Sequence, residues 1–265
     1  MLWGAIFGDI VGSVYEFDNI KTKEFSLFSE HGFITDDTCM TIAVADSLLK
    51  WKHGGGDLQA LAIKSMRDIG RCFPNMGYGF RFARWLDSDE NEPYDSWGNG
   101  AAMRVSAAGW VGQSISEVKR LSYMVTAVSH DHIEGIKGAE ATAVSVFLAR
   151  MGRDKSDIAK YITENYYDWC PSVSELQENY EWDGSCQGFV PQALQCFIES
   201  TDFADAIRNA ISIRGDSDTI AAITGAVAGA YYGVPDEIKA AARKYVPDEL
   251  LEIVDRFEGG TILQK

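Results

Sequence analysis

The apolar residues of this chain recur mainly at the three- and four-residue spacing of an amphipathic helix. Strict alternation of apolar and polar residues, the pattern of a half-buried strand, is nowhere sustained beyond a few positions. The chain also contains no linker-like stretch, low-complexity run or fixed-period repeat. The pattern therefore predicts an all-α fold of about a dozen helices that form a single domain over residues 1–265.

Three segments are apolar or small on nearly every side, which is typical of helices buried within a fold. They are residues 2–16, residues 35–50 and residues 220–230. Residues 17–34, between the first two, show no sustained period and are expected to form a long loop. Loops of this length in compact domains often act as lids.

The first buried segment combines close-packing glycines with two acids. Gly4, Gly8 and Gly12 recur every four positions, a spacing that lets another helix approach closely. Asp9 and Glu16 are seven residues apart and are expected to share one face of this helix. Asp9 is expected to be a hydrogen-bonded structural acid, whereas Glu16, at the edge of the loop, suits either structure or chemistry.

The two later buried helices both begin with two acids and a threonine. Thr35-Asp36-Asp37-Thr38 opens one, and Asp216-Ser217-Asp218-Thr219 opens the other. Carboxylates suit a helix start, where N–H groups are free and the dipole is positive. Buried like charges repel, however, unless something neutralises them. If the two starts meet, their oxygens form a shell suited to hard cations such as Mg²⁺ or Mn²⁺, with enough charge for two.

Each motif taken alone has a simpler interpretation as ordinary helix capping. Thr35 is a suitable N-cap with Asp36 and Asp37 in the first turn, and Asp216 or Ser217 could cap the later helix. The duplication favours a metal site, because capping needs one acceptor and each helix carries more.

Composition and charge narrow the class of protein. Hydrophobic residues make up 46% and charged residues 24%, which are globular values. The net charge of −15 argues against nucleic-acid binding, so an anionic substrate needs local help from metal ions or helix N-termini. Neither a signal peptide nor a membrane span is expected, since the N-terminus lacks a basic region and no apolar run is long enough.

The five cysteines are odd in number and form no C-x-x-C pair, which indicates neither a zinc site nor a disulfide framework. They are predicted to be core residues of a reduced, cytoplasmic protein. They are Cys39, Cys72, Cys170, Cys186 and Cys196.

Three turn-forming segments carry residues suited to ligand binding. Gly77-Tyr78-Gly79 lets backbone amides approach a ligand closely. In residues 94–100, Asn-Gly chemistry predicts a turn whose aromatic residues either stack on a base or cover the core. His130 and His132 flank an acid before a helix, where metal ligation, ligand hydrogen bonding and capping are all open.

Taken together, these segments resemble the ADP-ribosylglycohydrolase family of all-α, dinuclear-metal hydrolases. The matching pieces follow the family's order and span most of the chain. They are residues 8–16 (GDIVGSVYE), 35–38 (TDDT), 77–79 (GYG), 98–104 (GNGAAMR), 129–130 (SH) and 214–219 (RGDSDT).

The resemblance implies a site residue by residue. Two Mg²⁺ or Mn²⁺ ions would be held by Thr35, Asp36, Asp37, Asp216, Asp218 and Thr219. Glu16 would belong to the catalytic site, with either Glu16 or Asp36 handling a proton. The ADP-ribose cleft would be lined by Gly77, Tyr78, Gly79, Ser96, Trp97, Asn99, Gly100 and His130. Trp97 would stack on adenine, with Tyr94 as the alternative aromatic.

The function expected from this resemblance is a metal-dependent hydrolase that releases ADP-ribose from an ADP-ribosylated protein side chain or a small adduct. Two alternatives stay open. A di-metal phosphohydrolase could use an all-aspartate centre, although the H…HD pattern of histidine ligands is missing. A non-catalytic ADP-ribose-binding protein would be expected to have lost acids from the metal set, and none is lost. Neither the acceptor group nor the general base follows from the sequence.

Overall fold

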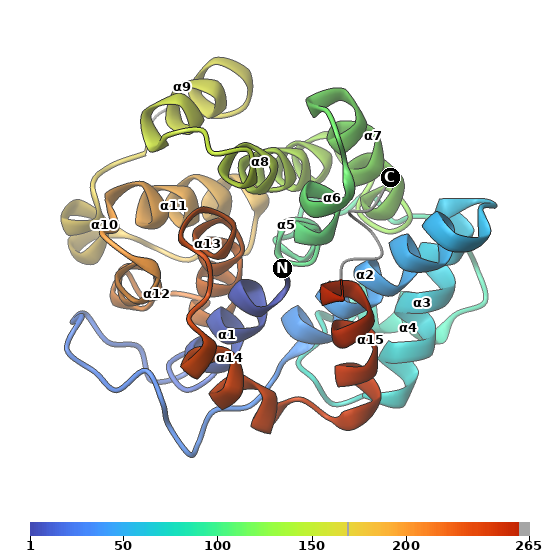
Figure 1. Ribbon diagram of the computed structural model, residues 1–265, viewed down its shortest axis with the longest axis horizontal. Helices are drawn as coiled ribbons and strands as arrows, with labels where there is room; N and C mark the ends of the chain where they lie inside the picture. The colour runs from blue at the N-terminus through green and yellow to red at the C-terminus, as the bar shows by residue number, and fades with distance from the viewer. Residues whose placement is uncertain (169, 260–265) are drawn as a thin grey trace.

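The computed structural model describes residues 1–168 and 170–259, so residues 260–265 of the predicted domain lie outside it. The described ranges are all-helical, which confirms the predicted fold class; they contain one isolated bridge, between Gly98 and Ser185, and no strand (Figure 1). The helices are α1 (Trp3–Gly12), α2 (Asp36–Gly54), α3 (Leu58–Cys72), α4 (Phe80–Asp87), α5 (Gly100–Met103), α6 (Ser106–Val111), α7 (Ile115–Thr126), α8 (Ile133–Arg150), α9 (Lys155–Asn165), α10 (Val173–Asn179), α11 (Cys186–Glu199), α12 (Phe203–Ser212), α13 (Ser217–Tyr232), α14 (Asp236–Ala242), a 3₁₀ turn η1 (Arg243–Tyr245) and α15 (Asp248–Glu258).

Helices α1 and α13 pack against each other at backbone contact distance. A methyl group added to Gly8 would lie 2.0 Å from the carbonyl oxygen of Ala221. One added to Gly12 would lie 2.3 Å from the Cα of Asp218. These contacts confirm the expected close approach along the glycine face. They also fix the end of α1 beside the acidic start of α13.

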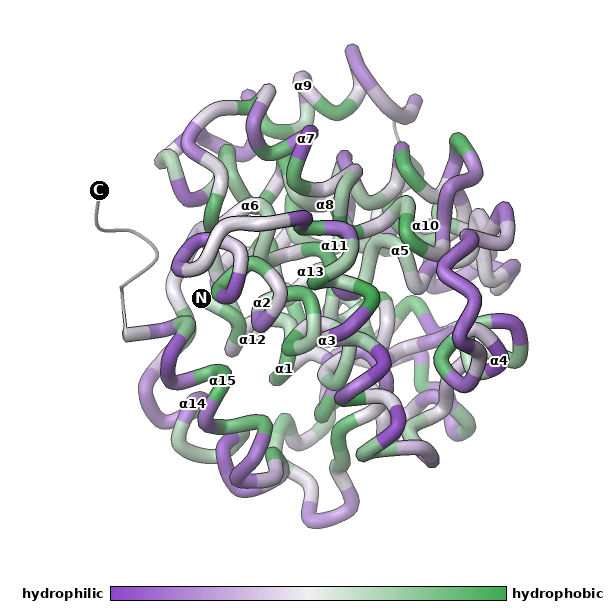
Figure 2. The backbone as a smooth tube through the Cα atoms, turned by 90° about the vertical axis from the view of Figure 1, so that its right-hand side faces the viewer, coloured by the Kyte–Doolittle hydropathy of each residue, from purple (hydrophilic) through white to green (hydrophobic). Residues whose placement is uncertain are grey.

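The other helices surround this pair. Helix α13 also packs against α8, α11 and α12, while α2 packs against α1, α3, α6 and α15. Figure 2 shows the hydrophobic stretches gathered in the middle of the molecule and most hydrophilic stretches along its outside. Both α2 and α13 are buried over most of their length, so their acidic first turns are the polar ends of core helices.

Helix α1 is shorter than the sequence pattern predicts. It ends at Gly12, not at residue 16, and a turn follows in which the Tyr15 N–H donates to the Gly12 carbonyl. Ser13 competes for the helical backbone, because its hydroxyl donates to Ile10 O and accepts the Phe33 N–H. Glu16 therefore sits on a turn, and helical phase does not set its direction relative to Asp9.

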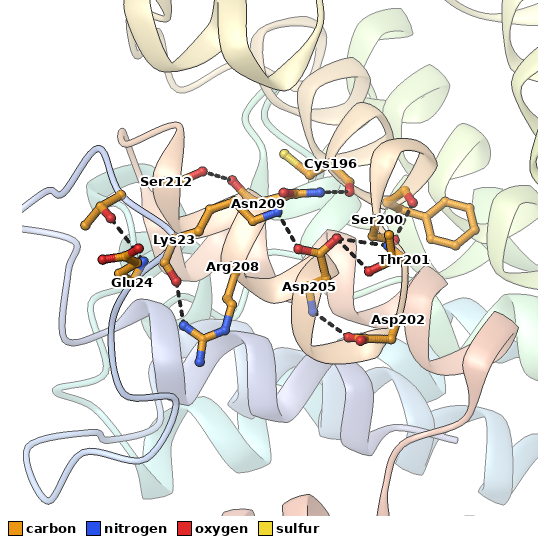
Figure 3. A network of polar contacts seen from close by, with 12 residues as sticks. Lys23, Glu24, Cys196, Ser200, Thr201, Asp202, Asp205, Arg208, Asn209 and Ser212 are labelled. Atoms are coloured by element: carbon orange, nitrogen blue, oxygen red, sulfur yellow. Dashed lines mark hydrogen bonds and ion pairs between the residues drawn. The ribbon is translucent and has the colours of Figure 1, made fainter.

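Residues 17–34 contain no helix, which confirms the predicted long loop. Its middle is fastened to α12: Nη1 of Arg208 donates to the carbonyl oxygen of Lys23 at 2.6 Å (Figure 3) and to that of Phe25, also at 2.6 Å. Asp205 accepts the Thr201 N–H, donates its own N–H to Oδ1 of the N-cap residue Asp202, and forms an ion pair with the Lys23 ammonium. The loop is thus anchored at its centre, away from Glu16.

Four of the five cysteines are buried, as predicted, but Cys72 is exposed. It is the last residue of α3, and the buried residues of this helix end at Gly70, two positions earlier. Among the described residues, no helix combines the length and apolar character needed to cross a bilayer.

Candidate active site

A cavity of about 940 Å³ lies beside the starts of α2 and α13. Glu16 lines it together with all six residues that the resemblance implies as metal ligands: Thr35, Asp36, Asp37, Asp216, Asp218 and Thr219. The two motifs are in direct contact, since the Thr219 hydroxyl donates to Oδ2 of Asp37 at 3.0 Å. The fold thus unites two motifs whose contacting residues lie 182 positions apart in the chain.

The start of α2 is organised by Asp9 from α1. Asp9 accepts the Thr35 N–H at 2.9 Å, the Thr35 hydroxyl at 2.7 Å and the Thr38 N–H at 3.0 Å. Thr35 is also the N-cap, because its Oγ1 accepts the Asp37 N–H at 3.2 Å. Asp9 therefore has the structural role expected of it, and capping uses Thr35 while leaving both aspartates free.

The start of α13 is organised differently. Arg214 and Gly215 adopt left-handed backbone with φ of 71° and 82°, which turns the chain sharply into the helix. Asp216 occupies the N-cap position but makes no capping bond; its Oδ2 instead accepts from Asn99 Nδ2 at 2.9 Å. Ser217 donates to the Gly12 carbonyl. Simple capping therefore does not explain the acids of this motif.

The carboxylates form a compact set without cationic partners. Glu16, Asp216 and Asp218 each place one oxygen within 4.8 Å of the others. Oδ1 of Asp37 is buried and accepts no hydrogen bond. None of the ion pairs formed by the described residues involves these four acids or Asp36.

Burial and mutual repulsion raise the pKa values of this set. Burial, with the charges of Asp216 and Asp9, raises the pKa of Glu16 to about 7. Burial, with Asp9 and Asp216, raises the pKa of Asp36 to about 8. Burial also raises the pKa values of Asp37 and Asp218 well above the ordinary range. Without a counter-charge, these acids therefore tend to take up protons and become neutral.

These residues fit divalent cations. Their donor atoms are all oxygen, the ligand type that Mg²⁺ and Mn²⁺ prefer. The unpartnered Asp37 oxygen and the raised pKa values are the features expected of acids arranged to receive positive charge.

The predicted ligand-binding residues divide into two groups. Six line the cavity: Gly77, Gly79, Ser96, Asn99, Gly100 and His130. Tyr78 and Trp97 do not. The Tyr78 ring packs on Phe82 with its hydroxyl buried, because the turn at Gly77 directs that side chain inward. The Trp97 ring packs edge-on against His132, at 5.2 Å between centroids.

Tyr94, the alternative aromatic, does line the cavity, and its ring lies edge-on to His130 at 5.5 Å. His132 caps α8 by accepting the Glu134 N–H, which decides among its open roles. The two histidines thus have different environments.

Several lining residues have no distinguishing signal in the sequence. Phe17, Phe80 and Trp182 are exposed aromatics on the cavity wall, and they come from three separate segments. Arg104 also lines the cavity. It belongs to the 98–104 motif, but the sequence suggests no role for its side chain. Only their convergence in space marks these residues.

Comparisons with known proteins show the family of the chain. Residues 1–264 match the family described as ADP-ribosylglycohydrolase. The chain is 25% identical to the human protein named ADP-ribosylhydrolase ARH3, over 94% of this chain and 90% of that protein. It is 26% identical to ADP-ribosylarginine hydrolase Tri1 of Pseudomonas putida (strain GB-1), over 96% of this chain and 77% of that protein. A solved structure titled "ADP-ribosylglycohydrolase-related protein complex" shares the fold, with a TM-score of 0.66 and 23% identity over 92% of this chain and 96% of the other.

Proposed function

Because the chain belongs to the ADP-ribosylglycohydrolase family, we propose that it is a metal-dependent hydrolase that releases ADP-ribose from a modified protein side chain or a small ADP-ribose adduct. One observation carries the proposal: five acids from three distant segments meet at a cavity whose volume of about 940 Å³ suits a nucleotide-sized ligand. Relatives whose names state ADP-ribosyl hydrolysis support it.

The proposed cofactor is a pair of Mg²⁺ or Mn²⁺ ions. The proposed ligands are Thr35, Asp36, Asp37, Asp216, Asp218 and Thr219. When bound, such ions supply charge neutralisation and Lewis-acid polarisation of ribose hydroxyls and water. Asp9 holds Thr35 in place, and Asn99 holds Asp216, so the ligand set is oriented from behind.

The protein's own acids would act on charge and protons. Hydrolysis of a glycosyl bond develops positive charge at the anomeric carbon, which nearby carboxylates stabilise. Glu16 stands on a turn at the cavity wall with a pKa of about 7, suited to accepting the proton of the attacking water near neutral pH. Asp36, fixed on the first turn of α2, is the alternative proton acceptor.

The substrate would lie beside the acids, along the glycine-rich part of the cavity wall. Backbone around Gly77, Gly79 and Gly100 allows close approach of the ligand, and the imidazole of His130 offers a hydrogen bond. Among the aromatics of the cavity wall, Tyr94 is the one that we propose contacts the base.

The test is a panel of substrates. The purified protein is incubated with ADP-ribosyl-arginine and ADP-ribosyl-serine peptides, each with Mg²⁺, Mn²⁺ or chelator, and free ADP-ribose is measured. Release that requires a divalent ion is the expected result, and the preferred peptide identifies the acceptor. Phosphate release from nucleotides without ADP-ribose release would indicate a phosphohydrolase instead, and binding without turnover a non-catalytic protein.

Two variants make the test specific. Asp216→Asn and Asp218→Asn are expected to abolish metal binding and activity while the helical circular dichroism signal is retained. The matched control is Asp57→Asn, at another helix start, where the side chain only caps α3 by accepting the Gln59 N–H. Full activity of both Asp216 and Asp218 variants would refute the site assignment.

A further inference from the structure

Arg104 is a buried cation without a carboxylate partner in the part of the chain that the structure describes. Its side chain is 1% exposed, and its guanidinium carbon lies 5.1 Å above the ring of Phe82. Nε and Nη1 have no hydrogen-bond partner among the described residues. Burying a charge in this way is costly, so the contacts that Arg104 does make need an explanation.

Those contacts lead to one atom of His130. Nη2 of Arg104 donates to Ser129 Oγ at 2.7 Å and lies 3.3 Å from His130 Nδ1. Ser129 Oγ lies 2.9 Å from the same Nδ1. A guanidinium can only donate, and a serine hydroxyl that accepts from it keeps its own proton to give onward. Both neighbours therefore offer hydrogen to Nδ1, which must accept.

The other ring nitrogen faces the cavity wall. A methyl group added to Gly100 would lie 3.2 Å from His130 Nε2, and one added to Gly98 would lie 3.8 Å from it. Both glycines line the cavity. Within residues 1–168 and 170–259, the hydrogen bonds of the His130 ring all involve Nδ1.

We propose that Arg104 and Ser129 are positioning residues that hold His130 as the neutral Nε2–H tautomer, so that this imidazole donates a hydrogen bond to an anionic oxygen of the ligand. The ligand part of this proposal rests on the function proposed above, in which an ADP-ribosyl group supplies such oxygens. Burial and the charges of Arg104 and Arg81 also hold the pKa of His130 well below its ordinary value. A protonated Nδ1 would face two donors.

One consequence follows for the site. His130 does not serve as a general base or a metal ligand through Nε2, because that nitrogen carries the proton.

The first test reads the tautomer directly. Long-range ¹H–¹⁵N spectra of histidine-labelled, ligand-free protein are recorded at about pH 6 and about pH 8, with His130 assigned from the loss of its signals in His130→Ala. A protonated Nε2 and an unprotonated Nδ1 are expected at both. Arg104→Lys, which keeps a donor, is expected to preserve this state, and Arg104→Met to admit the Nδ1–H form. An Nδ1–H or imidazolium ring in the unmodified protein would overturn the proposal.

The second test measures ADP-ribose binding by calorimetry in the presence of Mg²⁺. His130→Ala and Arg104→Met are each expected to weaken binding about tenfold or more, the usual worth of a hydrogen bond to a charged group. The double variant is expected to bind no worse than His130→Ala, because Arg104 acts through His130. Additive losses would contradict this.

Arg67→Met is the matched control, since Arg67 is another mostly buried arginine stacked on an aromatic ring, Trp85, outside the cavity lining. It is expected to change neither the tautomer nor the affinity. If Arg104→Met does not fold, Ser129→Ala replaces it and is expected to increase the Nδ1–H population. An unchanged tautomer in that variant would then count against the proposal.

These outcomes separate the two proposals. If His130 is the Nε2–H tautomer but the protein releases no ADP-ribose, only the proposed function is refuted. If the protein releases ADP-ribose but His130 is the Nδ1–H tautomer, only this inference is refuted.

Discussion

A carboxylate oxygen of Glu16 lies within 4.8 Å of one oxygen of Asp216 and one of Asp218. Glu16 belongs to a turn, whereas the two aspartates belong to a helix start far along the chain. Its pKa is raised to about 7, first by burial and then by the charges of Asp216 and Asp9. A carboxylate so placed is half protonated near neutral pH, the condition under which proton transfer in either direction is efficient.

Replacing Glu16 by Gln tests this role. We expect kcat to fall about 100-fold or more, because the amide cannot accept a proton, while the helical circular dichroism signal and melting temperature stay close to those of the unmodified protein. Glu24→Gln, an exposed acid on the same loop outside the cavity lining, is the control and should keep full activity. A kcat within threefold of the unmodified enzyme would assign the proton to Asp36.

At the scale of elements, the site depends on how closely α1 and α13 approach. Gly8 faces the backbone of Ala221 with no room for a methyl group. The same packing sets the position of Asp9, which organises the start of α2. One pair of helices therefore positions both halves of the acidic cluster.

Gly8→Ala is expected to force the two helices apart. Overpacking of this kind lowers the free energy of unfolding by about 3 kcal/mol, and activity should fall with it. The control is Gly54→Ala, at the exposed end of α2, where an added methyl group meets nothing within 4 Å. Urea unfolding measures both, and equal stability of the two variants would show that the helices adjust freely.

Asn19 joins the Glu16 turn to the start of α13. Its Nδ2 donates to the carbonyls of Tyr15, Glu16 and Gly215, and its Oδ1 accepts the Gly215 N–H at 2.9 Å. These hydrogen bonds hold the turn that carries Glu16 in a fixed position relative to the segment that carries Asp216.

Asn19→Ala is expected to lower kcat about tenfold, as loss of orientation of Glu16 does, without weakening Mg²⁺ binding by the aspartates. Hydrogen exchange of residues 13–19 should become faster. The control is Asn179→Ala, which removes a comparable hydrogen bond, donated by the Asn179 side-chain amide to the Glu175 carbonyl at the end of α10, away from the cavity lining. Unchanged exchange and unchanged kcat would show that the turn is held by other contacts.

At the scale of the whole molecule, the acidic cluster couples stability to pH and metal. The folded-state pKa values of Asp9, Glu16 and Asp36 are raised to about 6, 7 and 8, and those of Asp37 and Asp218 are raised well above normal. The metal-free folded protein therefore binds more protons than the unfolded chain, so its stability declines as pH rises through this window.

Urea unfolding in chelator is accordingly expected to show lower stability at about pH 8 than at about pH 5. Mg²⁺ should restore more stability at the higher pH, since it binds the ionised carboxylates. Asp37→Asn removes one buried acid and is expected to flatten the pH dependence in chelator. Chelated protein that is equally stable at both pH values would contradict this account of the cluster.

The sequence by itself determined the helical class, the buried segments and the residue types of the site, because hydrophobic spacing and helix-start chemistry are local. It placed Thr35 at an N-cap and identified the acids of both motifs. Tertiary structure alone decided that the motifs meet, through the glycine contact of α1 with α13. It also decided that α1 stops at Gly12 and that Trp97 turns to His132 while Tyr94 faces the cavity. The end of a helix and the direction of a side chain depend on which hydrogen-bonding and packing partners lie nearby in the folded protein. The spacing of hydrophobic residues along the chain does not determine those partners.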